Sequence, residues 1–505
     1  MNRTRFRSLL ATLFLSATSL GGCAGELDVS QSPGGSESQQ PASPALGEST
    51  GPDAGPSPAP AVEAPQAALD PEPGSELLES GFDIDPEKSL LIRDPAIVDN
   101  ATRTIDPCDA RRRGIARGPV TAAQTWTFGH LMTQMANGRD PAVFAQNWLA
   151  NWAISARVNG DDLVALPSRT NSITTLPGRI YDAWQRESGG SAGGTIQLAM
   201  NRAPFRLLAI VNRFDLRKNR RFNEGNSGEL RFIFSVLDLD RLESNGQGCL
   251  QARSIDTVST GNPGDQLLIL EYAVDHLSDT ARRDWISKWT ALYGLAFTDA
   301  AFAIALEQLT QTVVRAGAGG SRPNGSALIR LRTNESTDAV HWDLREFAIN
   351  GSGYLVPAAV KQTPKTNFTP QMVDPGLVNW IANNGSSILA DTHRVPDGYL
   401  GSHSINQASN TTWVFALQNF GVPSNVAYEF SRRTCVGCHS MDTGASFFHV
   451  HGRPFKVRPE ISHFLDGAYP GSPPSCPQDP DGNSHCFNEL ADRAADILSY
   501  LNGGG

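Results

Sequence analysis

The sequence predicts an α+β fold in which a large mixed body is followed by a small, mainly α-helical C-terminal module. Three observations support this: apolar runs typical of strands recur through the middle of the chain, amphipathic helical segments alternate with them, and the last residues form an isolated amphipathic helix. The 505 residues, 40% of them hydrophobic, suffice for roughly two to four domains with their own cores.

The strands of the body are predicted from Leu, Ile, Val and Phe content. Residues 204–214 and 229–239 are two such runs, and the Gly225-Asn226-Ser227-Gly228 turn between them predicts a hairpin. Further strands are expected at 267–274 and 326–332, and two more at 342–350 and 354–360, paired across Gly351-Ser352-Gly353. No internal repeat accompanies them.

The helices of the body are predicted from apolar spacing. Phe144, Trp148 and Trp152 recur every four residues in segment 141–154. Segments 279–293 and 298–315 should be helical as well, with Asp279 and Asp299 where N-caps are useful, and a helix near 375–383 precedes a polar loop to about 412.

The N-terminus predicts export. Arg3, Arg5 and Arg7 precede an apolar stretch at 8–20 that is too short to span a bilayer. Leu20-Gly21-Gly22-Cys23 then resembles the bacterial lipoprotein processing box, which implies a signal peptide at 1–22 and lipid on Cys23. Ala24 in place of Asp implies the outer membrane, with the protein facing the periplasm or the surface. The alternative is an ordinary cleaved signal peptide in which Cys23 is incidental.

The domain boundaries follow from composition. Residues 23–80 are rich in Pro, Ser, Gly and Ala and almost free of aromatics, so they predict a disordered tether between lipid and folded body. An α+β domain of unknown function, or two, is expected at 81–420, and the small module at 421–505. No other run is long and apolar enough to span a membrane.

A cysteine motif lies near the end of the chain. Cys435-Val436-Gly437-Cys438-His439 is a C-x-x-C-H, the spacing of c-type haem attachment, in which two thiols bind the vinyl groups and the histidine binds the iron. Two alternatives stay open. One is a Zn site from Cys435, Cys438 and two of His439, His449 and His451. The other is a Cys435–Cys438 disulfide, either structural or thioredoxin-like.

Segment 421–505 resembles a small c-type cytochrome domain in three places. These are the helix leading into the motif at 425–435, the motif itself, and the amphipathic helix at 489–501, for which Asn488 is the expected N-cap. The resemblance implies one covalently bound haem c. It departs at the sixth ligand, because Met441 is the only later methionine and is too close to His439. His449, His451 and His463 are therefore the candidate iron ligands, with an ordinary hydrogen-bonded histidine as the alternative at each position.

The other cysteines are expected to form disulfides, since export places them in an oxidising compartment. If haem takes two thiols and lipid takes one, Cys108, Cys249, Cys476 and Cys486 remain. Cys476 and Cys486 flank a short Pro/Asp/Gly loop and are the natural local pair, and Cys108 with Cys249 follows by elimination. Four cysteines nevertheless allow three pairings.

Little in the body predicts catalysis, and no catalytic residue is assigned. Phosphate-binding loops, nucleophile elbows and dinucleotide fingerprints are missing from the sequence. Asp275-His276, Glu335 and Glu346 could join a site, but such residues are more often surface or capping groups. Eight Lys or Arg against three Asp or Glu lie between Arg202 and Arg231. This stretch could dock haem propionates, lipid phosphate or an acidic partner, although we favour a solvated face of the hairpin.

These features predict an exported, lipid-anchored c-type haem protein that transfers electrons to a redox partner and carries a partner- or substrate-binding domain. The alternative is a non-enzymatic envelope or binding lipoprotein whose Cys/His-rich end is a Zn- or disulfide-stapled cap. An oxidase or peroxidase with an open haem site is a third possibility. The net charge of −10 argues against nucleic acid as a partner.

Overall fold

The computed structural model describes residues 84–503 except 106–107, 110–111, 113, 164–175, 191–196, 219–224, 245, 247, 252–265, 276–277, 337–340, 366–373, 408–412, 441 and 446. The predicted signal peptide, lipidated Cys23 and tether lie outside the described residues, as does Met441. Residues 80–505 form one compact unit. In the part of the chain that is described, no helix is both long and apolar enough to cross a bilayer.

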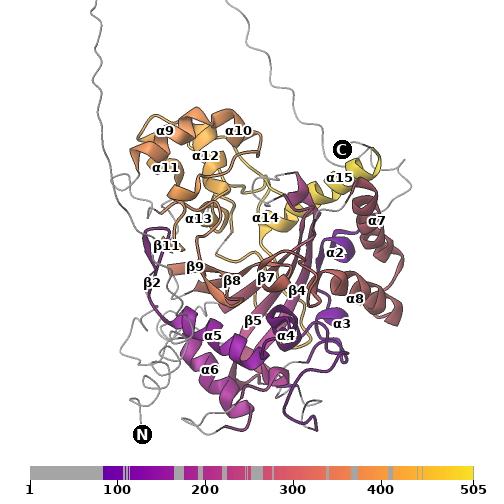
Figure 1. The fold of residues 1–505 in the computed structure, drawn as a ribbon. Helices are drawn as coiled ribbons and strands as arrows, with labels where there is room; N and C mark the ends of the chain where they lie inside the picture. The colour runs from indigo at the N-terminus through magenta and orange to yellow at the C-terminus, as the bar shows by residue number, and fades with distance from the viewer. Residues whose placement is uncertain are drawn as a thin grey trace, which may run out of the picture. The chain divides into compact units, whose positions relative to one another are not determined.

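The unit is built on a large antiparallel sheet (Figure 1). Its strands run in the order β1-β4-β5-β7-β8-β9, and β9 pairs along its other edge with β11 at one end and β10 at the other. β6 continues the sheet from the far end of β5. The bounds are β1 Leu91–Ile92, β4 Phe205–Arg213, β5 Glu229–Leu242, β6 Cys249–Gln251, β7 Gln266–Ala273, β8 Leu328–Ser336, β9 His341–Ile349, β10 Leu355–Ala358 and β11 Ser404–Gln407. A separate hairpin joins β2 Ala156–Val158 to β3 Asp161–Leu163.

One face of the sheet packs on helices and forms an aromatic core. The helices are α4 Phe128–Ala136, α5 Pro141–Ala153, α6 Leu176–Glu187 and α8 Ala300–Val314. Trp148 and Trp152 of α5 stack with ring centroids 5.3 Å apart. The ring centroids of Phe128 of α4 and Phe205 of β4 are 4.0 Å apart. Further helices lie beside the sheet at α2 Pro86–Ser89, α3 Pro95–Val98 and α7 Asp279–Thr290. The N-cap of α7 is Ser278 rather than Asp279, since the Ser278 hydroxyl accepts from the Ala281 N–H.

The opposite face is covered by the C-terminal third of the chain (Figure 1). It contains α9 Pro375–Asn383, α10 Gly385–Leu389, α11 Trp413–Gln418, α12 Ser424–Arg432, α13 Cys435–Cys438, α14 His463–Asp466 and α15 Glu489–Leu501. The polar loop expected up to about 412 thus also includes α10 and the edge strand β11.

The predicted fold class is wrong in its second part, because no separate helical cytochrome c-like module exists in the described chain. Among the described residues between α13 and α15, only the four-residue α14 is helical, and four residues cannot bury a core of their own. Phe430 and Val436 are instead fully buried in the same apolar cluster as the sheet residues. The segment folds by packing on the sheet rather than on itself.

Two disulfides connect four of the six described cysteines. Cys108 is joined to Cys249 at the start of β6, and Cys476 to Cys486 in the loop before α15. This is the pairing that local proximity and elimination favour in the sequence. Cys435 and Cys438 stay as free thiols.

Candidate functional site

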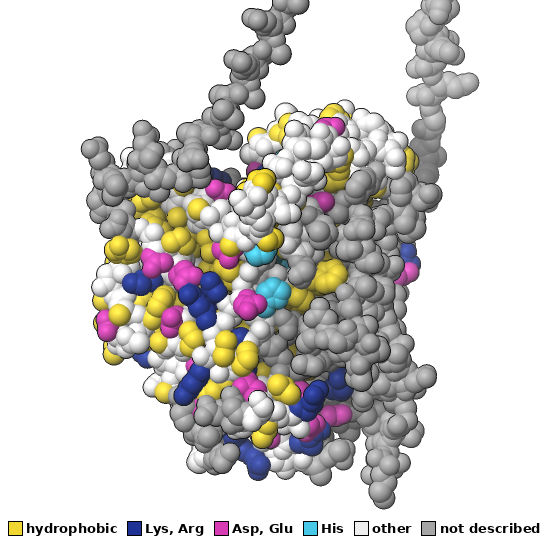
Figure 2. Space-filling view, turned by 180° about the vertical axis from the view of Figure 1, so that it is seen from behind, with side chains coloured by type: hydrophobic (Ala, Val, Ile, Leu, Met, Phe, Trp, Pro, Cys, Tyr) yellow, Lys and Arg dark blue, Asp and Glu magenta, His cyan; other side chains and the backbone are white. Residues whose placement is uncertain are grey.

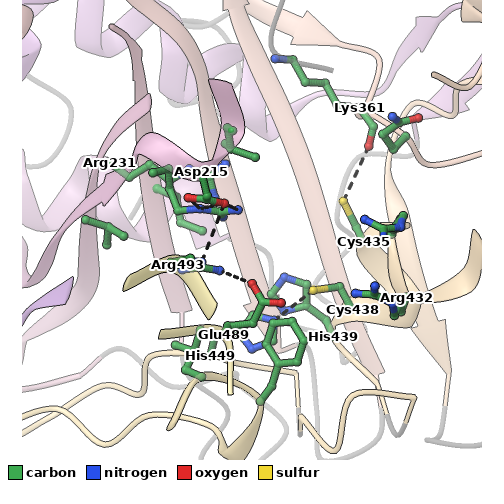
Figure 3. Close-up of a pocket in the computed structure, with 18 of the residues that line it drawn as sticks. Asp215, Arg231, Lys361, Arg432, Cys435, Cys438, His439, His449, Glu489 and Arg493 are labelled. Atoms are coloured by element: carbon green, nitrogen blue, oxygen red, sulfur yellow. Dashed lines mark hydrogen bonds and ion pairs between the residues drawn. The ribbon is translucent and has the colours of Figure 1, made fainter. Parts of the chain in front are cut away.

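A cavity of about 470 Å³ lies between the sheet and the C-terminal segment. Its floor is the sheet face opposite the aromatic core, and its roof includes α13 and α15 (Figure 3). Cavities of this size are typical of small-molecule sites.

The floor follows from strand alternation, because every second residue of a strand points to the same face. Ile233, Ile269 and Arg332 are direct cross-strand neighbours on β5, β7 and β8. The parallel rows bring further apolar and cationic side chains to the same face, so the floor residues are Leu91, Val211, Arg213, Arg231, Ile233, Leu267, Ile269, Arg332, Asn334 and Leu344. The floor is therefore an apolar surface interrupted by guanidinium groups.

Buried glutamates compensate the floor arginines. Arg231 Nη2 lies 2.6 Å from Glu229 and 3.1 Å from Glu271, and Arg332 Nη2 lies 2.8 Å from Glu346. Burial opposes ionisation of Glu229, but Arg231 holds its pKa below the ordinary value. Burial raises the pKa of Glu271, which also lies near two other carboxylates. The network fixes the arginine side chains at the cavity.

The roof is shaped by a one-turn helix that presents the motif. Thr434 is its N-cap, and its hydroxyl accepts from the Gly437 N–H at 3.1 Å. Gly437 is required there, because a Cβ at this position would lie 2.0 Å from the Ser431 carbonyl oxygen. Cys435 and Cys438 both line the cavity and are partly exposed, as are His439 and His449.

His439 is held as a neutral side chain. Its Nδ1 lies 2.8 Å from the Phe447 carbonyl oxygen, and its ring stacks on Trp342 with centroids 4.9 Å apart. Burial lowers the pKa of His439 to about 4, so the imidazole is uncharged at neutral pH.

Cys438 faces a histidine that a third residue orients. Cys438 Sγ lies 3.3 Å from His449 Nε2, and His449 Nδ1 lies 2.9 Å from the Ser462 hydroxyl (Figure 3 shows the first contact). Burial raises the pKa of Cys438 to about 12 and lowers that of His449 well below its ordinary value. At rest the pair is therefore a neutral thiol beside a neutral imidazole.

The predicted cofactors are wrong for this arrangement. Among the described residues, no group of three or more His, Cys, Asp or Glu side chains is placed to hold a metal ion. The two thiols have different partners, since Cys435 Sγ lies 4.0 Å from the Lys361 carbonyl oxygen and Cys438 Sγ contacts His449. The residues therefore do not fit haem c or Zn, and the site does not support haem-based electron transfer.

The structure brings only some of the predicted residues together. Cys435, Cys438, His439 and His449 line one cavity, whereas His451 and His463 do not line it. His463 is instead partly exposed on α14, 3.9 Å from Asp466.

The acidic residues that the sequence offered as site candidates, Asp275, Glu335 and Glu346, do not line the cavity. Asp275 pairs with Arg322, and His276 lies outside the described residues. Glu346 lies beneath the cavity floor, as its contact with Arg332 shows. Glu335 faces the opposite side, where it accepts from the Trp152 indole at 3.0 Å.

The basic stretch from Arg202 to Arg231 is not one solvated face. Arg206 is buried against Glu243, while Arg213, Lys218 and Arg231 line the cavity, and Arg220 and Arg221 lie outside the described residues. On the face drawn in Figure 2, Lys and Arg side chains lie among Asp, Glu and hydrophobic ones rather than in a patch of one sign.

Several residues of the site were not predicted. Arg332, Arg493, Glu489 and Ser462 come from distant parts of the chain. For Arg332, a signal was present, because Arg330 and Arg332 alternate with apolar residues at the start of their strand, and this alternation indicates a polar feature on one face of the sheet. The sequence does not reveal which strands and loops share that feature.

No family model, curated protein or solved structure matches this chain.

Proposed function

We propose that this protein binds a small molecule with an apolar body and an acidic group in the cavity between the sheet and α13–α15. The single observation that carries the proposal is a cavity of about 470 Å³ whose floor alternates aliphatic side chains with arginines. Aliphatic side chains such as Ile233 and Ile269 would contact the apolar body, and a few convergent polar groups would fix its orientation.

The arginines support an acidic group through their orientation. Arg213, Arg231, Arg332, Arg432 and Arg493 line the cavity, and each contacts its carboxylates through Nε and Nη2. Among the described residues, none of the hydrogen bonds or ion pairs of these five uses Nη1. Since a guanidinium carries five N–H donors, each keeps donors for a ligand.

The charge balance of the cavity restricts the charge expected of the ligand. Eight Lys or Arg and five Asp or Glu line the cavity, and three more glutamates lie against the floor arginines. The fixed charges therefore nearly cancel. Selectivity for an acid would come from oriented N–H donors, which suit one carboxylate or sulfonate better than a polyanion.

A fluorescent probe tests this proposal. 8-Anilinonaphthalene-1-sulfonate combines an aromatic body with one sulfonate, and we expect saturable binding to the folded protein. Ile269→Trp should abolish it by filling the floor. Arg432→Gln should weaken it about tenfold or more, because a hydrogen bond to a charged group contributes about 1.5–3 kcal/mol. Arg186→Gln is the matched control, since Arg186 forms an exposed ion pair with Asp240 away from the cavity.

Equal probe affinity in wild type, Ile269→Trp and Arg432→Gln would overturn the proposal, provided circular dichroism shows all three folded. Long-chain carboxylates should displace the dye, and the corresponding alcohols should do so poorly.

We also propose that the protein is exported and lipid-anchored through Cys23, on the sequence pattern alone. Cells fed a labelled fatty acid should incorporate it into the wild-type protein but not into Cys23→Ser. Equal labelling of both, or of neither, would contradict the anchor.

A further inference from the structure

We propose that Cys438 is a reactive thiol served by His449 as its base, and that Cys435 resolves the intermediate, so that the cavity performs thiol–disulfide exchange on a small disulfide. This rests on the proposed function, because the disulfide would be the ligand that the cavity binds. The geometry has the three parts of an activated nucleophile: thiol, base, and a group that orients the base.

The orientation of His449 is fixed from both sides. Nε2 faces Cys438 Sγ at 3.3 Å and Nδ1 faces the Ser462 hydroxyl at 2.9 Å. The ring also packs against Phe464, with centroids 4.9 Å apart. A histidine held in this way presents one nitrogen to the thiol proton.

The second thiol makes a two-step exchange possible. Cys435 lies on the same helical turn, three residues before Cys438, and lines the same cavity. Its Sγ is directed toward the Lys361 carbonyl at 4.0 Å, so it must rotate toward Cys438 to form a bond. The other four cysteines of the described chain are already paired, which leaves these two as its free thiols.

The exchange takes place in two steps. His449 Nε2 takes the Cys438 proton, and the thiolate attacks one sulfur of a disulfide RSSR, forming Cys438–S–S–R and releasing RS⁻, which takes the proton from His449. Cys435 then attacks the Cys438 sulfur, a Cys435–Cys438 disulfide forms, and the second RS⁻ leaves with the Cys435 proton. Two protein thiols are oxidised and one disulfide is reduced to two RSH; the reverse reaction oxidises RSH.

The position of the thiols favours a small substrate. They are partly exposed in the wall of a cavity of about 470 Å³. A small aromatic or aliphatic disulfide with a carboxylate fits such a space. Burial keeps Cys438 a thiol and His449 a neutral imidazole at rest, so the thiolate forms only transiently, as the proton moves to His449 during the attack.

The test uses 5,5′-dithiobis(2-nitrobenzoate), a small aromatic disulfide with carboxylates. All proteins carry Cys23→Ser and retain both native disulfides, as checked by mass spectrometry. Wild type should release two thionitrobenzoates and lose two hydrogens with no adduct. Cys435→Ser should release one and keep the adduct on Cys438. His449→Gln should react about 100-fold more slowly, and Ser462→Ala about fivefold more slowly.

Unreactive thiols in folded wild type would overturn the inference. So would two retained adducts, or an unchanged rate in His449→Gln. Dye binding on the same samples distinguishes the ligand-binding proposal from the thiol-exchange inference. Protein that binds the dye but shows no exchange would contradict only the thiol-exchange inference. If the protein binds no dye, and wild type and Arg432→Gln exchange at the same rate, only the ligand-binding proposal is contradicted.

Discussion

The two faces of the central sheet differ in kind although the same strands build both. On one face, Phe205 packs against Trp148 and Trp184, and Phe234 packs against Phe128, in a buried aromatic core. On the other face, arginines and glutamates alternate with aliphatic residues beneath a cavity with two thiols. Apolar helix faces pack onto the first face as a core, whereas the charged side of α15 and the short α13 leave a space with polar walls on the second.

The aromatic core on the helix face should depend on volume. Trp148→Ala removes a side chain that is 0% exposed, so we expect the free energy of unfolding to fall by about 3–5 kcal/mol. Chemical denaturation at pH 5.5 and 8 should give the same loss. Dye binding and thiol exchange should persist, and their loss in folded protein would show that the two faces are coupled.

The cavity face should depend on charge. Arg332→Met leaves Glu271 and Glu346 without a cation that each contacts, so we expect a loss of about 3 kcal/mol at pH 8. Protonation of these acids would relieve it, so the loss should shrink as the pH falls toward 5. A loss that does not change with pH would contradict the role of this ion-pair network.

The helix face also contains buried ionisable groups, and one of them, Glu335, gives a smaller effect. Burial raises the pKa of Glu335 to about 7, and Asp343 adds to this. This pKa in the folded protein lies above that in the unfolded chain, so the protonated Glu335 carboxyl stabilises the fold. That contribution should be lost as the pH rises from about 4.5 through about 7. Glu335→Gln should therefore lose less stability between pH 5.5 and 8 than wild type. The exposed Asp162→Asn is the control, and identical slopes for Glu335→Gln and wild type would contradict the assignment.

Local signals in the sequence predict much of the fold. The strand at 204–214 is observed as Phe205–Arg213, and the helix at 489–501 as Glu489–Leu501 with Asn488 as its N-cap. Apolar runs and caps act between near neighbours, so they can be read along the chain. The motif at 435–439 likewise marks the roof of the cavity.

The partners of that motif could not be predicted in the same way. Arg332 is separated from Cys438 by about a hundred residues, and only the strand register brings it to the floor. The analogy to an independent cytochrome-like module failed for the same reason. The apolar sides of α12 and α13 complete the core of the sheet rather than a core of their own.

The position of α15 determines when the site can exist during biosynthesis. Asp496 pairs with Arg217 and Lys218, which follow β4, and Glu489 and Arg493 of α15 form part of the cavity wall. The ribosome delivers the strands of the floor long before this last helix. Until the final residues arrive, a nascent chain therefore lacks the part of the cavity wall that α15 supplies.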